Sequence, residues 1–399
     1  MIQSITINNF KSVRSLTMNL GRVNVVIGEN GCGKTNVLEA IAFASAIGQG
    51  LLTPEILGRK MRLVPAEFMV PAFADVNMEN AQEKIISINV ETQDGLPRYI
   101  RAIYDSKSKE WINAGSIIDD LNVVHILKKV HEIDPKAFDE LTNSIEQKDA
   151  LVRAVDSHNL AEVSALMPDM FREVKNVMLD KPELDAFVIY NPEENKLRQF
   201  SDDTMLYPLG RNGEGLFQYL KEIHIGDKQC VMESIVQRMT LLDWFDGIYV
   251  PDGLLSNEYR LQIGDRYLKE SLHYFDQRST NEGFLYLLFY MTLFSSPDTP
   301  LFFAIDNIES AFNPKLCTKI IQTIVQMAKD NNKQVILTTH SPYVLDGLDL
   351  TDDEQRLFVV KRNKDGHTTM KRIPAKNDIN MRLSEVWMKG MIGGLPDNF

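Results

Sequence analysis

The chain has 399 residues, and its 43 lysines and arginines against 55 aspartates and glutamates give a formal net charge of −12. Hydrophobic residues make up 44% and charged residues 25%, which excludes disordered, collagen-like and disulfide-scaffold chains and favours two or three lobes. The three cysteines and the lack of a leader or of an apolar run near the roughly 20 residues of a membrane span predict a reduced, cytoplasmic protein with no membrane partner.

The N-terminal part of the chain predicts short strands that lead into one helix. Apolar residues alternate with polar ones up to Leu20, which is typical of half-buried strands. The continuous apolar run Val23–Ile27 indicates a fully buried strand, and a helix is expected from Lys34 to about Ala46. Further strands are expected at Ile85–Val90 and Tyr99–Tyr104.

Residues 106–185 form a predicted helical insertion. Polar residues dominate it, and apolar residues recur at helical spacing, as at Leu121, Val124 and Leu127. Pro135 and Pro168 interrupt the pattern, so we expect a few short helices and no long coiled-coil arm.

The C-terminal half alternates strands and helices, as expected of an α/β sheet. The remaining strands are expected at Ala186–Tyr190, at Leu197–Phe200, in a hairpin within Ile248–Leu268, at Leu301–Ile305 and at Val335–Leu337. The remaining helices are expected at Leu216–Ile223, Cys230–Phe245, Glu282–Phe294 and Pro314–Ala328.

The strongest motif lies between the buried strand and the first helix, where the chain fits the pattern G-x-x-x-x-G-K-[ST]. Glycines let successive backbone N–H groups point at phosphate oxygens, and the helix that begins here directs its positive end at the same anion. Lys34 is expected on the β- and γ-phosphates and Thr35 on Mg²⁺. The predicted nucleotide site comprises Gly28, Asn30, Gly31, Cys32, Gly33, Lys34, Thr35 and Asn36. The helix end is expected to lower the pKa of the Cys32 thiol, whose main role we interpret as a small filler.

Two later strand ends carry polar groups that would complete this site. Asp306 follows the buried strand Leu301–Ile305, at the edge where parallel sheets bind ligands, and is predicted to hold magnesium together with Thr35. His340 stands in Thr-Thr-His-Ser-Pro after the next buried strand, where it could hydrogen-bond a γ-phosphate or an attacking water.

This order of phosphate loop, long insertion, Asp-tipped strand and Thr-Thr-His-Ser-Pro resembles the ATP-binding-cassette (ABC) ATPases of the RecF and OLD (overcoming lysogenization defect) type, which are related to the structural-maintenance-of-chromosomes (SMC) heads. The segments ITINNFKSV and NVVIGENGCGKTNVLEAI are similar to the first lobe of this family, and LSEVWMKGMIGGLPDNF is similar to the ending of its small stand-alone members, which lack a nuclease domain. The resemblance implies an α/β P-loop NTPase of the ABC-ATPase type, with a mixed sheet, N-terminal antiparallel strands and an inserted helical subdomain. It divides the chain into a first lobe with the phosphate loop, the helical insertion, a second lobe with a signature-like loop and a C-terminal part, at residues 1–105, 106–185, 186–300 and 301–399.

The resemblance also implies a head dimer, or a higher even oligomer, that encloses ATP and Mg²⁺. Each site would join the phosphate loop of one copy to a signature loop of the other. The matching segment is Arg278–Phe284, where Ser279 or Asn281 takes the place of the family's serine and Gly283 follows. Such a loop would aim a helix N-terminus at the γ-phosphate. The alternative is a capped helix start that contacts no second copy.

One residue departs from the family pattern. The family has a glutamate directly after the aspartate, whereas this chain reads Asp306-Asn307-Ile308-Glu309. An amide is a poor base, and loss of a general base lowers a rate by about 10²–10⁴-fold. Hydrolysis is therefore expected to be slow or partner-dependent, with Glu309, His340 or a partner supplying the base. The predicted catalytic residues are Lys34, Asp306, His340 and Glu309.

Three functions remain open from the sequence. The first is a cytoplasmic ATPase that regulates a separate effector, such as a nuclease or toxin, in nucleic-acid sensing or anti-phage defence, with nucleic acid as a further partner. The second is a RecF-like DNA repair ATPase, and the third is a nucleotide-gated scaffold with little or no turnover. The sequence contains no motif for a nuclease centre or a zinc site, so any cutting would come from a partner.

Overall fold

The computed structural model describes two compact units, which we treat separately. The described residues are 1–48, 85–93, 97–105, 110–113, 148–157, 159–166, 182–199, 208–226, 228–249, 261–269, 279–375 and 381–395, with shorter pieces within 57–73 and 127–135, at 251 and at 274–276. The first unit comprises Met1–Leu20, Glu39–Asp185 and Arg362–Met370, and the second comprises Gly21–Leu38, Ala186–Lys361 and Lys371–Phe399. Several predicted positions, namely Leu121, Val124, Pro168, Phe200 and Arg278, lie outside the described residues.

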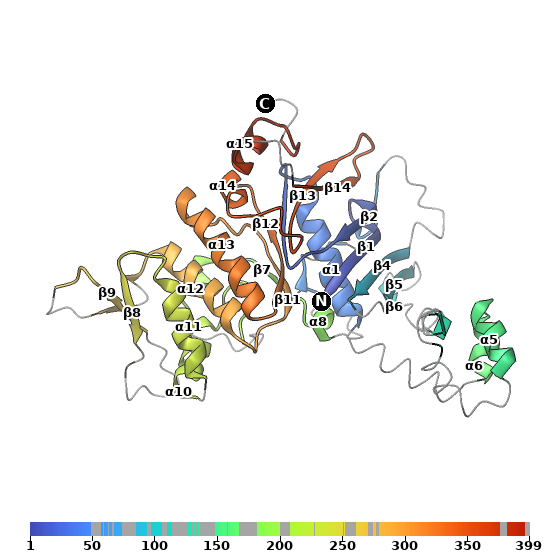
Figure 1. Cartoon of the computed structure of the whole chain (residues 1–399), viewed down its shortest axis with the longest axis horizontal. Helices are drawn as coiled ribbons and strands as arrows, with labels where there is room; N and C mark the ends of the chain where they lie inside the picture. Colours follow the sequence, from blue (N-terminus) through green and yellow to red (C-terminus); the bar gives the residue numbers. More distant parts are fainter. Residues whose placement is uncertain are drawn as a thin grey trace. The chain divides into compact units, whose positions relative to one another are not determined.

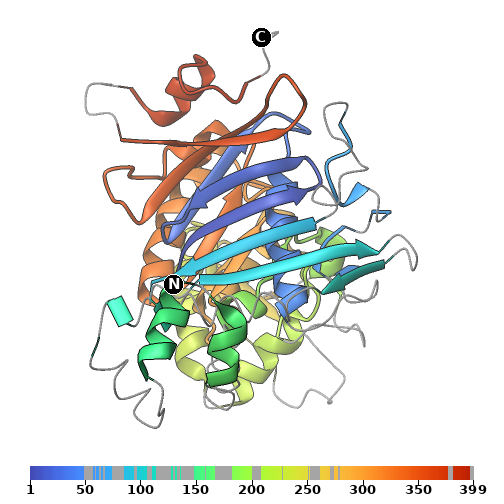
Figure 2. The ribbon, with the colours of Figure 1, turned by 90° about the vertical axis from the view of Figure 1, so that its right-hand side faces the viewer.

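The first unit contains a five-stranded antiparallel sheet, in the order β2-β1-β4-β5-β6 (Figure 2). Its strands are β1 (Ile2–Phe10), β2 (Val13–Asn19), β4 (Ile85–Thr92), β5 (Pro97–Asp105) and β6 (Glu110–Asn113). The predicted N-terminal antiparallel strands are thus confirmed. Strand β6 lies within the range expected to be helical and extends the sheet. The described helices of that range are α5 (Lys148–Asp156), α6 (Leu160–Leu166) and α8 (Pro182–Asp185).

The second unit is built on parallel strands in the order β13-β3-β12-β11-β7 (Figure 1). These are β3 (Val23–Gly28), β7 (Ile189–Tyr190), β11 (Phe302–Ile305), β12 (Gln334–Thr338) and β13 (Gln355–Arg362), with β14 (Thr368–Ile373) at the edge. Every residue of β3, β11 and β12 is buried, which explains their continuous apolar runs. Because these three strands are parallel neighbours, their carboxyl ends lie at one edge of the sheet.

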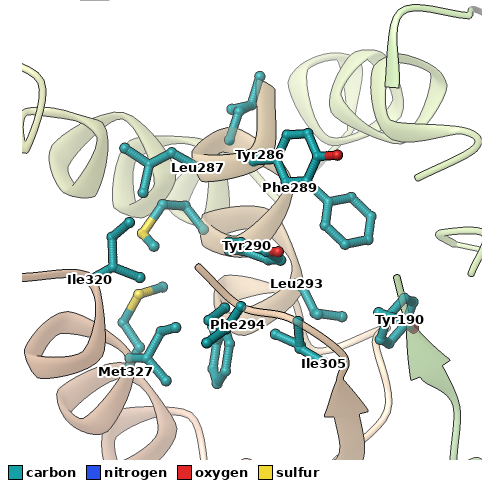
Figure 3. Packing of buried hydrophobic residues seen from close by; sticks show 14 of the residues in the cluster. Tyr190, Tyr286, Leu287, Phe289, Tyr290, Leu293, Phe294, Ile305, Ile320 and Met327 are labelled. Atoms are coloured by element: carbon teal, nitrogen blue, oxygen red, sulfur yellow. The ribbon is translucent and has the colours of Figure 1, made fainter. Parts of the chain in front are cut away.

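The central helix of the second unit is α12 (Glu282–Ser295), whose residues from Phe284 onward are all buried. A helix that is apolar on all sides is expected in the core rather than at the surface. Figure 3 shows Tyr290, Leu293 and Phe294 of α12 packing near Ile305 of β11, with α13 (Pro314–Asp330) beside them. Helix α13 is amphipathic, and its N-cap Asn313 accepts a hydrogen bond from the Leu316 N–H at 3.0 Å.

Two sequence expectations for this unit are wrong. Residues Leu197 to Gln199 are not a strand. Leu197 is the last residue of helix α9 (Glu194–Leu197), and its side chain is buried. The Arg198–Glu194 ion pair of 2.6 Å has the i,i+4 spacing of a helical turn. The helix expected to reach Phe245 ends at Met239, and Phe245 instead begins a strand.

The other elements of the second unit surround this core. A three-stranded antiparallel sheet consists of β8 (Phe245–Tyr249), β9 (Gln262–Asp265) and β10 (Phe275–Asp276), so the expected hairpin is present. The remaining helices are α10 (Leu216–Ile225), α11 (Gln229–Met239), α14 (Pro342–Leu345) and α15 (Leu383–Met388), while α1 (Lys34–Gly48) starts in the second unit and continues into the first.

A buried lysine closes the turn after α12. The Lys333 Nζ donates to Ser296 O at 2.7 Å, to Thr299 O at 2.8 Å and to Thr299 Oγ1 at 2.7 Å. The side chain is almost fully buried, and this burial lowers the pKa of Lys333 to about 8. The lysine therefore satisfies the carbonyl of the C-cap residue Ser296 and that of Thr299 in the turn that follows the helix.

We expect Lys333→Met to lower the free energy of unfolding at pH 7 by about 2–4 kcal/mol, because the carbonyls of Thr299 and Ser296 lose the Lys333 donor, although the Ser296 carbonyl keeps the hydrogen bond from the Thr299 hydroxyl. The pKa of Lys333 lies below that of an unfolded lysine, so the unfolded state binds more protons between about pH 8 and 10.5 and wild-type stability rises with pH there. The variant should lose the part of this rise that Lys333 contributes, while Lys60, whose pKa is also lowered to about 8, keeps its own part. Urea unfolding at pH 7 and pH 9.5 measures both effects, with the exposed Lys329→Met as control. Equal urea midpoints for wild type and Lys333→Met would contradict the assignment.

Candidate nucleotide site

The phosphate loop connects buried strand β3 to helix α1 within the second unit. A Cβ on Gly28 would lie 2.2 Å from Val360 O, and Gly28 has a φ of 153°, so the loop can begin only with glycine. Gly31 has a φ of 74°, and a Cβ there would meet nothing within 4 Å. The first N–H groups of α1 have no acceptor inside the helix. The loop is therefore shaped for an anion on its open side.

Lys34 lies folded against its own loop. Its Nζ donates to Gly28 O at 2.8 Å and to Glu29 O at 2.9 Å, and the side chain is 6% exposed. Burial lowers the pKa of Lys34, while the charges of Asp306 and Glu309 are among those that oppose the shift. The amine and both carboxylates are therefore within electrostatic reach of one another.

Asp306 lies beside the threonine of the phosphate loop. The Thr35 Oγ1 donates to Asp306 Oδ2 at 3.3 Å, and the Thr338 hydroxyl donates to Asp306 Oδ1. The Asp306 carboxylate is thus oriented from two sides, by the start of α1 and by the end of β12. Carboxylate and hydroxyl oxygens are ligands that Mg²⁺ prefers, so these groups fit the ion.

Glu309 and His340 also meet at this edge of the sheet. The Glu309 Oε1 accepts a hydrogen bond from the His340 backbone N–H at 2.8 Å. The Glu309 Oε2 is buried and has no hydrogen-bond partner among the residues that the structure describes. An unpaired buried carboxylate oxygen can accept a hydrogen bond from a donor such as a water molecule. The pKa of the exposed His340 is lowered by partial loss of hydration and by the Lys34 charge, and the Glu309 and Asp306 charges oppose this shift.

Asn307 occupies a left-handed turn, with a φ of 58°. Its backbone N–H donates to Thr338 Oγ1 at 2.9 Å, and its carbonyl accepts from the Ser310 hydroxyl at 2.9 Å. Asparagine adopts this conformation more readily than most other residues. The turn places Glu309, rather than residue 307, against the His340 backbone.

The expected activation of Cys32 is wrong. The side chain is 3% exposed, and burial raises the pKa of the Cys32 thiol. The charge and backbone N–H of Lys34 act in the opposite direction but do not outweigh the loss of hydration. Cys32 Sγ lies 2.9 Å from where a Cβ on Gly28 would sit, which agrees with a filler role.

The signature-like loop begins α12. Asn281 is the N-cap of the helix, and its Oδ1 accepts from the Phe284 N–H at 2.8 Å. The Ser279 N–H donates to Asp276 Oδ1 at 3.2 Å. Gly283 packs closely on the turn after β11, because a Cβ on Gly283 would lie 3.0 Å from Ala311 O. These contacts fit a capped helix start, and both exposed side chains, Ser279 and Asn281, remain alternatives for the family's serine.

An arginine attaches this loop to α9. The Arg198 Nη2 donates to Thr280 O at 2.8 Å, and its Nε donates to Glu194 Oε1 at 3.0 Å. The loop position is therefore linked to the short helix that follows β7.

Asn191, which was not among the predicted site residues, also stands at this edge of the sheet. Tyr190 ends β7, which pairs in parallel with β11, and the Asp306 N–H donates to Tyr190 O at 2.9 Å. Asn191 is thus the next residue at the edge where Asp306 stands. The rule that singled out Asp306, a polar residue directly after a buried parallel strand, would have found it.

The C-terminal segment lies against the start of the phosphate loop. A Cβ on Gly394 would be 3.4 Å from Gly28 Cα and 3.6 Å from Trp387 Nε1. The Trp387 indole is 4% exposed, and its Nε1 has no hydrogen-bond partner in the described part of the chain. Helix α15, which carries Trp387, is held to α14 by Ser384, whose hydroxyl donates to Asp346 Oδ2 at 2.7 Å.

Residues 23–346 match the family described as "AAA domain, putative AbiEii toxin, Type IV TA system". The chain belongs to this family. It is an ABC-type ATPase of the RecF/SMC-like group, as the resemblance predicted. The α/β fold with a mixed sheet is likewise confirmed.

Relatives of this ATPase include RecF. The DNA replication and repair protein RecF of Clostridium perfringens is 25% identical over 229 residues, which cover 56% of this chain and 57% of RecF. An uncharacterised protein of Methanocaldococcus jannaschii is 30% identical over 95 residues, or 24% of this chain and 43% of that protein. The chain spans about half the length of these curated relatives. The fold is similar to the crystal structure of an SMC head bound to the C-terminal winged-helix domain of ScpA. The two structures align over 95% of this chain and 99% of the SMC head chain, with a TM-score of 0.50 and 13% identity.

The described residues of the chain lack two kinds of feature. None of the helices there combines the length and the apolar character that crossing a bilayer requires. In the same part of the chain, no three histidine, cysteine or acidic side chains converge as a metal site.

Proposed function

We propose that the protein binds Mg-ATP at the phosphate loop and hydrolyses it slowly. The observation that supports this most directly is the 3.3 Å hydrogen bond between Thr35 and Asp306, because it joins residues 271 positions apart in the arrangement that a magnesium nucleotide needs. Lys34 would leave the carbonyls of its own loop for the β- and γ-phosphates. When bound, Mg²⁺ would neutralise charge on the phosphate oxygens.

Glu309 is the proposed general base. Its unpaired Oε2 would accept a proton from the attacking water while the water oxygen bonds to the γ-phosphorus and the bond to ADP breaks. His340 would hydrogen-bond the γ-phosphate, and its backbone N–H would keep Glu309 in place. Asn191, at the same edge as Asp306, would orient the water through its amide.

We further propose that two copies, or a higher even number, close around ATP and regulate a separate effector. The signature-like loop of one copy would face the nucleotide of the other. The family description names a toxin, and an SMC head of similar fold binds a domain of ScpA, so a separate protein partner is a reasonable expectation. Nucleic-acid sensing or anti-phage defence in the cytoplasm would be the setting. The RecF relative favours one alternative, a DNA repair ATPase.

Two measurements on the full chain test the proposal. Steady-state phosphate release, with and without DNA or RNA, should show slow turnover that nucleic acid stimulates. Light scattering with Mg-ATP and with a non-hydrolysable analogue should show nucleotide-dependent dimers. Dimers without turnover would identify a scaffold, stimulation by DNA with no co-purifying effector would favour the repair function, and no nucleotide binding would refute the proposal.

A further inference from the structure

A buried tyrosine on the central helix has no evident reason to be a tyrosine. Tyr290 of α12 is fully buried, and its hydroxyl has no hydrogen-bond partner among the described residues. Its ring is fixed by aromatic neighbours, with centroid distances of 6.4 Å to Tyr286, 5.9 Å to Phe289 and 6.0 Å to Phe312. Figure 3 shows the Tyr290 side chain within the apolar cluster. Buried hydroxyl groups are nearly always paired, so this one calls for a partner.

The carboxylate of Glu309 presents the complementary group. Its Oε1 is held by the His340 N–H, whereas its Oε2 is buried without a partner in the described chain. One orphaned atom is a hydrogen-bond donor and the other is an acceptor.

The backbone brings the two residues to the same place. The Phe312 N–H donates to Glu309 O at 3.1 Å, and the Phe312 ring packs on Tyr290. Gly283, at the start of α12, approaches Ala311 O. Helix α12 therefore runs along the turn that contains Glu309.

We propose that Tyr290 is a positioning residue that donates its hydroxyl hydrogen bond to the Glu309 carboxylate and so sets the orientation in which Glu309 accepts the proton of the attacking water. This inference rests on the proposed function. The two oxygens are not bonded in this structure, so the proposed hydrogen bond requires a change in the side-chain torsions of Glu309. Each carboxylate oxygen has two lone pairs, so Oε2 can accept from Tyr290 and still receive a proton.

The electrostatics agree with this role. The pKa of Tyr290 is raised well above its usual value by burial first, and then by the charges of Tyr286 and Glu309. The hydroxyl therefore remains protonated and keeps its proton to donate. Because α12 also begins with the signature-like loop, one helix would carry both the contact to a second copy and the residue that orients the base.

The test compares Tyr290→Phe with Tyr286→Phe, the same change one turn earlier on the same helix. We expect Tyr290→Phe to lower kcat about tenfold with an unchanged KM for ATP, and Tyr286→Phe to retain wild-type kinetics. In a Glu309→Gln background, which lacks the base, Tyr290→Phe should cause no further loss in single-turnover hydrolysis. Wild-type kcat in Tyr290→Phe, or the same tenfold loss in both backgrounds, would overturn the inference.

A second readout does not depend on turnover. In urea unfolding, Tyr290→Phe and Glu309→Gln should have non-additive effects on the free energy of unfolding, as expected of two groups that share a hydrogen bond. Additive effects would overturn the inference. Absence of hydrolysis in the wild type would refute the proposed ATPase function, and the coupling in unfolding would still decide whether the two side chains interact.

Discussion

Lys34→Ala is expected to abolish stabilisation by Mg-ATP and to leave the nucleotide-free protein nearly as stable as wild type. Wild-type protein at a nucleotide concentration of about 100 Kd should gain about 2.7 kcal/mol in its free energy of unfolding, and the variant should gain none. The physical reason is that, among the residues that the structure describes, the Lys34 Nζ bonds to carbonyls of Gly28 and Glu29 in the same loop, so its loss removes little native structure. Thermal unfolding across a series of Mg-ATP concentrations measures this effect.

The matched control is Lys329→Ala, which removes an exposed lysine near the end of α13 and should keep the full shift in melting temperature. Mg²⁺ without nucleotide should stabilise neither variant. A melting temperature of Lys34→Ala that rises with Mg-ATP as steeply as that of wild type would remove the main support for the nucleotide site.

Glu309→Gln is expected to lower the rate of ATP hydrolysis by about 10²–10⁴-fold while nucleotide binding is retained. Glutamine keeps a carbonyl oxygen that can accept from the His340 N–H, as Glu309 Oε1 does at 2.8 Å, but it cannot take a proton from water. Rapid-quench single-turnover kinetics separate this loss from changes in binding or product release.

Asn307→Glu tests the same assignment from the other side, because it restores the glutamate that the family has directly after the aspartate. If Glu309 is the base, this change should not raise the rate, and the left-handed φ of 58° disfavours a glutamate there. Normal turnover in Glu309→Gln, or a large increase of the hydrolysis rate in Asn307→Glu, would show that Glu309 is not the general base.

The elements that the sequence predicted well carry local signals. The phosphate loop has a motif, and the runs Val23–Ile27 and Leu301–Ile305 are apolar because β3 and β11 are buried on both faces. The position of Asp306 follows from the edge rule for parallel sheets. These patterns depend on residues that are adjacent in the chain, so they can be interpreted without coordinates.

The features that were missed depend on distant parts of the chain. Nothing near Tyr290 in the sequence indicates that its ring packs on Phe312, in the turn that contains Glu309. The raised pKa of Cys32 results from burial, which its position at a helix start does not reveal. The end of helix α9 was mistaken for the start of a strand at Leu197, because a buried leucine is as common in a helical turn as in a strand. The role of Glu309 is a proposal that the variants above test.

The packing of Gly394 and Trp387 beside the phosphate loop provides an optical reporter. The chain has three tryptophans, and the indole of Trp387 is the one whose unpaired N–H lies near the start of that loop. Phosphates that settle in the loop would change the electric field at this indole, and with it the intrinsic fluorescence of the protein. Subtracting the emission of Trp387→Phe would isolate that signal, so nucleotide arrival could be followed in real time without any attached dye.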